Sequence, residues 1–475
     1  MMQNNLWTLD ALLTATGGTL RGNPGQSFGG VSIDSRTIAN GDIFVAIKGD
    51  AMDGHDFVPA AIAKGAGMAI VSRIHDNWSN DLPLLLVGDP LLALERIGKA
   101  ARARSHARII AVTGSVGKTS TKEMLRVALA ASGETHASAA SFNNHWGVPL
   151  TLSRFPTTAS FGVFEIGMNH AGEITPLVGM VRPHVAIVTT VAASHLGHFK
   201  SLDQIADAKA EIFSGVVAGG HAVINRDSPY FEHLKSAALA HGITSIIGFG
   251  RHPAAEVRLE GLALRPDCCC ITAQILGEKI IYKLGMPGEH MALNSLAVLA
   301  AAKLVGADLA RAALALSEAK PAKGRGGQLK LQMPEGELLL LDESYNANPA
   351  SVSAALALLS NLKPTKNGRH IAVLGDMLEL GEFGPDLHRN LSHDIERHGI
   401  DRVYVAGPLM QNLWDVLPTA KRGAYAPVSA SIVGDLIGEL KAGDCVMIKG
   451  SLGSKMGPIV EALKAKWPIS QKEDT

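Results

Sequence analysis

The sequence predicts an α/β protein of three domains, and three observations lead to this prediction. A chain of 475 residues is long enough for about three domains of ~150 residues each. Its 50 glycines, together with an aromatic content of only 5%, are typical of a fold with many turns between strands and helices. Short apolar runs that end in Gly, Asp or Ser alternate with helical patterns, which indicates parallel sheets covered by helices.

Residues 1–106 are expected to form the first, small α/β domain. An apolar run over residues 43–47 predicts a strand, and turn residues and an Ala-rich helical pattern follow it. Residues 107–325 are expected to form the second domain, which starts with "RIIAVTG", a predicted buried strand, and contains most of the chemically informative motifs. The segment "KGRGGQ", residues 323–328, is rich in glycine and predicts a hinge after this domain.

Residues 326–475 are expected to form a C-terminal, Rossmann-like domain. Four apolar runs predict its buried parallel strands, namely "ELLLLDES", "HIAVLGD", "DRVYVAG" and "DCVMIKG". Strands that are buried on both faces read as continuous apolar runs of this kind, because helices cover both sides of the sheet.

Composition excludes several classes of function. The 44 basic residues balance 44 acidic ones, which argues against nucleic acid or an anionic membrane surface as a partner. No run of about 18 apolar residues is present, so no membrane span is predicted. The four cysteines, three of them at 268–270, fit neither a disulfide framework nor a metal spacing. The first residues lack the pattern of a signal peptide, and we expect a cytoplasmic monomer with reduced thiols.

The segment "TGSVGKTS", residues 113–120, predicts a phosphate-binding loop. A strand, a glycine turn and a helix N-terminus direct backbone N–H groups and the helix dipole at an anion. Lys118 would reach the outer phosphates of ATP and Thr119 would ligate Mg²⁺. Val112 stands where the standard pattern has its first glycine, and the two glycines are Gly114 and Gly117. The alternative is an ordinary glycine turn with a surface lysine.

Two further candidates stand where predicted strands end. Glu165 ends the apolar run of "FGVFEIG", and His195 follows that of "HVAIVTT". Because the carboxyl ends of parallel strands meet in the ligand crevice, Glu165 would bind Mg²⁺ and His195 a second ion. The alternatives are a capping carboxylate and a hydrogen-bonded loop histidine, and spacing alone does not choose among His195, His170 and His198. The residues alone favour a solvated helix lysine at Lys209.

Taken together, these motifs resemble the Mur ligase family of ATP-dependent, amide-forming enzymes. The resemblance rests on T-G-x-x-G-K-T, the strand-end glutamate, the histidine of "HLGHF" and the lysine of "AKAEIF", and it covers nearly the whole chain. The segments "DESYNANPAS" at 342–351 and "GDMLELGEFG" at 375–384 are similar to those of members that add D-alanyl-D-alanine to UDP-N-acetylmuramoyl-tripeptide in peptidoglycan synthesis. The resemblance therefore implies these two substrates, ATP and two Mg²⁺ ions.

The resemblance also implies a role for each matching position. The phosphates of ATP would be held by the loop residues Gly114, Ser115, Val116, Gly117, Lys118, Thr119 and Ser120. Thr119 and Glu165 would hold one Mg²⁺. His195 would hold the second, with a carbamate formed on Lys209. Asn294 would contact adenine, and Arg325 and Asp342 would reach the phosphates and the ribose when the third domain closes. Substrate contacts are implied for Ser35, Arg36, Lys48, Asn143, Asn144, Asn346 and Asn348.

The implied reaction activates a carboxylate as an acyl phosphate, which an amine then attacks without a covalent enzyme intermediate. Three alternatives stay open. A ligase that adds the third residue usually has an Asp-Asn-Pro-Arg motif, which this chain lacks. A folylpolyglutamate synthase would not need the nucleotide-type first domain. An ATP-binding switch that ligates nothing would not need Glu165, His195, Lys209 and Arg325 together.

Overall fold

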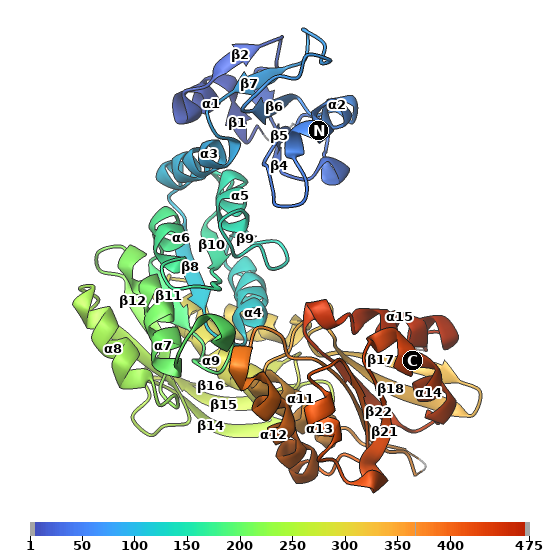
Figure 1. Ribbon diagram of the computed structural model, residues 1–475. Helices are drawn as coiled ribbons and strands as arrows, with labels where there is room; N and C mark the ends of the chain where they lie inside the picture. Colours follow the sequence, from blue (N-terminus) through green and yellow to red (C-terminus); the bar gives the residue numbers. More distant parts are fainter. Residues whose placement is uncertain (1–4, 366, 471–475) are drawn as a thin grey trace.

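Residues 5–365 and 367–470 are described by a computed structural model, in which three large sheets follow one another along the chain and a two-stranded ribbon accompanies the first (Figure 1). The N-terminal sheet lies at one end of the molecule, and the other two lie side by side. Within the described residues, no helix is both long and apolar enough to cross a membrane. The four cysteines are free thiols, and three of them are buried.

The N-terminal unit has a five-stranded sheet in the order β2-β7-β6-β5-β4, with a two-stranded ribbon beside it. The sheet is parallel except at β2, which pairs antiparallel with β7. Its strands are β2 (Thr19–Arg21), β4 (Val31–Ser32), β5 (Ile43–Val45), β6 (Met68–Val71) and β7 (Leu84–Leu86). The ribbon and helices are β1 (Trp7–Thr8), β3 (Ser27–Phe28), α1 (Leu9–Thr16), α2 (Val58–Ala63) and α3 (Pro90–Arg104).

The helix α3 fastens this unit to the central one. It begins at the Asp89 cap, whose carboxylate accepts from the N–H of Leu91 at 2.7 Å, and Pro90 fits the first turn because it has no N–H to satisfy. The buried guanidinium of Arg102 donates to the carbonyls of Val181 at 2.7 Å and Arg182 at 2.9 Å. These bonds tie α3 to the end of the central helix α6 (Ile174–Val181).

The central sheet has nine strands in the order β16-β15-β14-β13-β12-β11-β8-β10-β9. Its strands are β8 (Arg108–Thr113), β9 (Thr135–Ala137), β10 (Phe161–Glu165), β11 (Val185–Val188), β12 (His221–Asn225), β13 (Ser245–Gly250), β14 (Val257–Leu264), β15 (Cys269–Ile275) and β16 (Glu278–Leu284). Besides α6, its helices are α4 (Lys118–Ala130), α5 (Gly147–Ser153), α7 (Leu202–Ala210), α8 (Phe231–Ala240), α9 (Glu289–Leu304) and α10 (Leu309–Ala315).

The predicted parallel sheet is present from β9 to β14, but β15 and β16 extend it as antiparallel strands that the sequence analysis did not predict. The strand order reverses at β8, because β10 pairs with one of its edges and β11 with the other. Loops that leave the carboxyl ends of these three strands diverge, and such a switch point is where open α/β sheets bind ligands.

The C-terminal sheet has six strands in the order β17-β18-β22-β19-β20-β21, parallel apart from the hairpin of β17 and β18. Its strands are β17 (Gly327–Met333), β18 (Gly336–Glu343), β19 (His370–Gly375), β20 (Arg402–Ala406), β21 (Arg422–Ala426) and β22 (Cys445–Lys449). Its helices are α11 (Pro349–Asn361), α12 (Gly384–Arg397), α13 (Gln411–Trp414), α14 (Val433–Glu439) and α15 (Gly457–Lys466).

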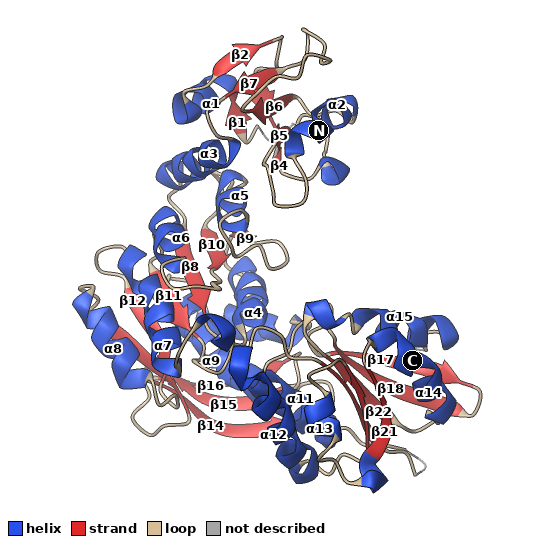
Figure 2. Ribbon diagram, viewed as in Figure 1, coloured by secondary structure: helices blue, strands red, loops and turns tan. Residues whose placement is uncertain are grey.

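The four apolar runs of the third part are β18, β19, β20 and β22, so the predicted parallel strands are confirmed. Figure 2 shows α11, α12 and α13 on one side of this sheet and α14 and α15 on the other. A separate apolar core fills each side. We propose that each sheet with its helices is one domain. The boundaries proposed from the sequence fall shortly before β8 and β17.

Candidate active site

The loop between β8 and α4 requires glycine at two positions. Gly114 has a φ of +148°, and a Cβ there would lie 1.9 Å from Oγ1 of Thr189. Gly117 has a φ of +86°, and its Cβ would lie 2.6 Å from Nδ2 of Asn294. Val112, in contrast, is buried within β8 and needs no special backbone conformation. The glycines therefore stand where the backbone has a positive φ and where Thr189 or Asn294 leaves no room for a side chain.

The strand β11 and its following loop hold the phosphate loop rigidly. Thr189 donates its hydroxyl to the carbonyl of Val116 at 2.6 Å, and the hydroxyl of Ser115 bonds the backbone of Ala192 as donor and acceptor, each at 2.9 Å. Lys118 folds back and donates Nζ to the carbonyl of Gly114 at 2.7 Å. Desolvation lowers the pKa of Lys118, and the carboxylate of Glu165 opposes that shift. A preformed cradle of this kind avoids reorganisation when an anion arrives.

Replacing Gly114 with alanine is expected to weaken ADP binding strongly. Strained backbone costs about 1–3 kcal/mol, which is about 5- to 150-fold in affinity, and the contact with Thr189 adds to that. Isothermal titration with ADP and Mg²⁺ measures the effect. The control is Gly172→Ala, because Gly172 also has a positive φ, +87°, but a Cβ there meets nothing within 4 Å. Equal ADP affinity in Gly114→Ala and wild type would show that the loop does not hold the nucleotide.

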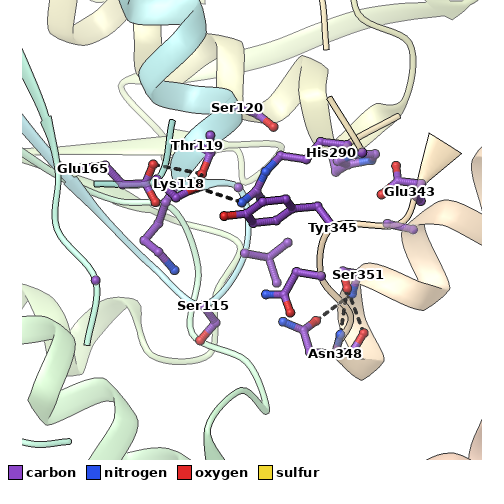
Figure 3. A pocket seen from close by; sticks show the side chains of 18 of the residues that line it. Ser115, Lys118, Thr119, Ser120, Glu165, His290, Glu343, Tyr345, Asn348 and Ser351 are labelled. Carbon is purple, nitrogen blue, oxygen red and sulfur yellow. Dashed lines mark hydrogen bonds between the residues drawn. The ribbon is translucent and has the colours of Figure 1, made fainter. Parts of the chain in front are cut away.

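Glu165 lies beside this loop at the end of β10. In the parallel pairing Glu165 stands opposite Val112, and its side chain is 1% exposed. Its Oε2 accepts from the hydroxyl of Thr119 at 2.9 Å (Figure 3). Its Oε1 accepts from Nδ2 of Asn143 at 2.7 Å. The interpretation of Glu165 as a capping carboxylate is therefore wrong, since its two bonds are both to side chains.

The pair of Glu165 and Thr119 fits Mg²⁺. A buried carboxylate and a hydroxyl in contact offer hard oxygen ligands, and Mg²⁺ usually binds to one or two carboxylates plus phosphates and water. In the described part of the chain, no group of three or more His, Cys, Asp or Glu residues could enclose a metal by itself. Phosphate oxygens and water would therefore complete the shell.

The structure distinguishes the three candidate histidines. His195 lines the cavity that contains Lys118 and Glu165. The ring of His170 packs against that of His198 at 4.4 Å between centroids, and His170 also pairs with Glu173 at 2.9 Å. Neither His170 nor His198 lines that cavity. Of the three, His195 alone is placed where it could meet a phosphate-bound ion.

Lys209 on α7 is buried, with an exposed fraction of 2%, so the solvated lysine that the residues alone favoured is wrong. Within residues 5–365 and 367–470 it forms no ion pair. Burial, and next the charge of Lys118, hold the pKa of Lys209 well below its ordinary value. A lowered pKa favours the neutral form of the amine. The neutral form is the nucleophile that reacts with carbon dioxide.

Replacing Lys209 with methionine is expected to raise the thermal midpoint at neutral pH in carbonate-free buffer. The pKa of Lys209 is lower in the folded state than in the unfolded state, so the unfolded state binds the proton more tightly. At pH values below the ordinary lysine pKa, this difference lowers the free energy of unfolding. This penalty decreases as the pH rises toward the ordinary lysine pKa. The difference in thermal midpoint between the variant and wild type should therefore decrease as well. The control, Lys235→Met, alters a lysine paired with Glu232 at 3.5 Å on α8 and should show no such trend. A gap that does not change with pH contradicts the lowered pKa.

A cavity of about 290 Å³ lies between the phosphate loop and the C-terminal sheet. Figure 3 shows Lys118, Thr119 and Glu165 on one side and Glu343, Tyr345 and Asn348 on the other. The guanidinium of Arg325 lies 4.3 Å from the centre of the Tyr345 ring and donates to Oγ of Ser141 at 3.3 Å. Arg325, from the predicted hinge, thus places a cation in the cavity that the phosphate loop lines.

Other residues around this cavity support it. Asn348 caps α11 by accepting from the N–H of Ser351 at 2.9 Å. Buried Lys449 pairs with Glu343 at 3.1 Å and donates to the carbonyl of Asn346 at 2.9 Å. Lining residues that the sequence did not predict include Ser141, His290, Glu343, Tyr345 and Lys449.

Several predicted site residues do not line the cavity. Asp342 is buried, and its carboxylate accepts from both the N–H and the hydroxyl of Ser344. The Oδ1 of Asn144 accepts from the N–H of Gly147 at 2.9 Å and from that of Trp146 at 3.2 Å, just before α5. Asn294 is not among the lining residues, although it lies against Gly117. The three N-terminal candidates also lie outside it, namely Ser35, Arg36 and Lys48.

The N-terminal unit nevertheless reaches the loop that Asn143 and Asn144 occupy. A Cβ at Gly49 would lie 3.0 Å from the tip of the Trp146 ring. Lys48 forms an isolated bridge with Asp53 next to this contact, whereas Arg36 is exposed and pairs with Asp34 at 2.8 Å. The segment around Lys48 thus contacts the central unit at Trp146.

Comparison with known proteins identifies relatives over the whole described fold. Family models match residues 27–125 ("Mur ligase family, catalytic domain"), 112–302 ("Mur ligase middle domain") and 332–452 ("Mur ligase, glutamate ligase domain"). The UDP-N-acetylmuramoyl-tripeptide--D-alanyl-D-alanine ligase of Escherichia coli (strain K12) is 34% identical over 96% of this chain and 98% of its own length.

Solved structures agree with the sequence relatives. The crystal structure of MurF from Acinetobacter baumannii has a TM-score of 0.84 and 30% identity, and the match covers 97% of this chain and 99% of that one. MurF ligase from Thermotoga maritima in complex with ADP has a TM-score of 0.76 and 25% identity, over 92% of this chain and 97% of that one. The chain therefore belongs to the Mur ligase family.

Proposed function

We propose that this protein is an ATP-dependent ligase that joins D-alanyl-D-alanine to UDP-N-acetylmuramoyl-tripeptide in peptidoglycan synthesis. The observation that carries the proposal is the cavity in which Lys118, the pair of Glu165 and Thr119, and Arg325 of the hinge face one another. The relatives at 30–34% identity bear the name of this ligase, which gives the substrates. We also propose that it acts as a monomer in the cytoplasm, with no nucleic-acid partner.

The chemistry follows from a carboxylate that is unreactive toward amines at neutral pH. A carboxylate oxygen of the tripeptide attacks the γ-phosphorus of ATP, the bond to the β-phosphate oxygen breaks, and ADP leaves. The amine of D-alanyl-D-alanine then attacks the acyl carbon, loses a proton, and expels phosphate from a tetrahedral intermediate. Both anions must approach each other, so the site needs positive charge more than a nucleophile.

The residues of the chain divide this work. The backbone N–H groups of 114–120 and Nζ of Lys118 hold the phosphates, and Arg325 adds charge from the hinge. Thr119 and Glu165 would hold one Mg²⁺, and His195 with a carbamate on Lys209 would hold a second. Such ions would supply charge neutralisation at the phosphates. Closure of the C-terminal domain over the cavity would exclude water, which would otherwise hydrolyse the acyl phosphate.

Phosphate release tests the proposal and its alternatives. Purified protein receives ATP and Mg²⁺ with the nucleotide tripeptide alone, with D-alanyl-D-alanine alone, or with both. The proposal predicts release that requires both substrates together. Release that requires a single diamino acid and a nucleotide dipeptide, or a folate and glutamate, would assign another ligase of the superfamily. Release that needs no second substrate would contradict the proposal and favour an ATP-binding switch.

A further inference from the structure

The segment at 375–384, "GDMLELGEFG", has no part in the reaction above, yet it is fixed tightly to the C-terminal sheet. The carboxylate of Asp376 accepts from the N–H of Met410 at 2.9 Å, and the N–H of Leu378 donates to Oγ of Ser451 at 2.9 Å. The N–H of Met377 donates to Nε2 of buried His388 at 2.9 Å. These hydrogen bonds fix the backbone of residues 376–378, and so they also restrict the position of the residue that follows.

That next residue, Glu379, lies where the C-terminal unit contacts the central one. Its carbonyl accepts from the N–H of Gly197 at 2.9 Å. A Cβ at Gly381 would lie 2.7 Å from Cα of Gly197, so only glycine allows so close an approach. The turn at Gly381–Phe383 is thereby docked onto the turn at Leu196–His198.

At this contact the carboxylate of Glu379 meets the ring of His195. Its Oε2 lies 2.5 Å from Nδ1 of His195. Both residues have a left-handed backbone, with φ of +64° at Glu379 and +58° at His195. Such strain costs about 1–3 kcal/mol for a residue that is not glycine, and it concentrates at functional sites. Two strained residues that contact each other across a domain boundary indicate a contact that the fold maintains.

The contact has a chemical consequence for His195. When Glu379 accepts from Nδ1–H, the ring keeps its proton there, and the lone pair of Nε2 is left free for a metal ion. Both side chains line a cavity of about 140 Å³ together with Lys118 and Ser115. The side chains are 21% and 49% exposed, so as an ion pair the contact contributes little stability. Orientation of the ring is the larger effect.

We propose that Glu379 is a positioning residue, which fixes the tautomer and orientation of the His195 ring for binding a divalent cation. The proposal rests on the proposed function, because it takes His195 as a metal ligand. The orienting carboxylate belongs to a different domain from the ligand, so the C-terminal domain must be docked for the site to be complete. Docking of the C-terminal domain would then strengthen cation binding at His195, and cation binding would favour docking by the same free energy.

Glu379→Gln in the full-length enzyme tests the proposal, with Glu382→Gln as the matched control. Glu382 is exposed in the same segment and forms no ion pair within the described ranges. Nitrogen NMR of the histidine rings in the metal-free enzyme reports where His195 carries its proton. We expect Nδ1–H in wild type and Glu382→Gln, and a shift toward the other tautomer in Glu379→Gln.

The second measurement is Mn²⁺ binding, followed by electron paramagnetic resonance with a non-hydrolysable ATP analogue. Loss of an orienting partner typically weakens a metal site about 10- to 100-fold, so we expect a change of that size in Glu379→Gln, with the ring nitrogen of His195 still coupled to Mn²⁺. The control should match wild type.

Two results would overturn the proposal. An unchanged tautomer and unchanged Mn²⁺ affinity in Glu379→Gln would show that the contact does not position His195. Complete loss of the second Mn²⁺ together with its coupling to His195 would make Glu379 a metal ligand. Neither result bears on the proposed function, which instead depends on phosphate release by the wild-type enzyme with both substrates.

Discussion

Glu165→Gln is expected to lower kcat/KM by about 10³-fold, which corresponds to about 4 kcal/mol of transition-state stabilisation. In the structure one carboxylate oxygen accepts from Thr119 and the other from Asn143. A glutamine presents an N–H₂ group to one of these two donors, so a hydrogen bond is lost, and the charge that would bind Mg²⁺ is lost as well. Because Glu165 is buried, a donor left without its partner there costs more free energy than one at the surface.

Steady-state kinetics at several Mg²⁺ concentrations measure this effect. We expect the loss mainly in kcat, since the phosphate loop and Lys118 still hold ATP. Glu173→Gln is the control, because Glu173 is 43% exposed and pairs only with neighbouring residues of its own segment. If Glu165→Gln keeps more than about a tenth of wild-type kcat/KM, the assignment of a metal to Glu165 and Thr119 is wrong.

Lys209→Ala is expected to lower activity by about 10²- to 10³-fold, as removal of a buried charge that stabilises a transition state does. Lys209 is buried and its pKa is lowered by desolvation, which favours the neutral amine that can form a carbamate, and the deletion leaves space for a small anion. Added formate or acetate should therefore restore part of the activity to Lys209→Ala and not to wild type. Lys235→Ala should behave as wild type, since Lys235 only pairs with Glu232 on the surface of α8. Full activity of Lys209→Ala without added acid would show that a carbamate on Lys209 has no role in the reaction.

Much of the fold and the centre of the site could be predicted from the sequence, because they follow from local rules. The strand, glycine turn and helix of the phosphate loop are contiguous, so residues 113–120 could be interpreted directly. Glu165 could be predicted because parallel strands end at one edge of a sheet, and the pairing with Val112 confirms that placement. The four strands of the third domain could be predicted because continuous apolar runs are typical of buried parallel strands.

Other features depend on contacts between distant segments. The burial of Lys209 is decided by the packing of α7, and its helical pattern alone favours an exposed side chain. Tyr345 follows β18 of the C-terminal sheet and lines the same cavity as the phosphate loop, which lies far from it in the sequence. A signal was available for Glu343 and Lys449, since each ends a predicted strand, β18 or β22, and the rule used for Glu165 applies to both.

The hairpin of β15 and β16 had a signal too. Apolar and polar residues alternate over residues 271–275, as expected for a strand covered on one face, and Gly277 follows as a turn residue. Cys269 is in fact a buried residue of this strand, and its Sγ donates to the carbonyl of Met286 at 3.4 Å.

The most direct test of the account follows the oxygen atoms of the carboxylate. The nucleotide tripeptide is prepared with a heavy oxygen isotope in its terminal carboxylate, and the reaction runs with ATP and D-alanyl-D-alanine. Mass spectrometry of the products then shows where the label goes. The account predicts one labelled oxygen in each released phosphate, because the acyl phosphate takes that oxygen from the carboxylate. Phosphate without label, or label in AMP, would contradict activation by phosphoryl transfer at this site.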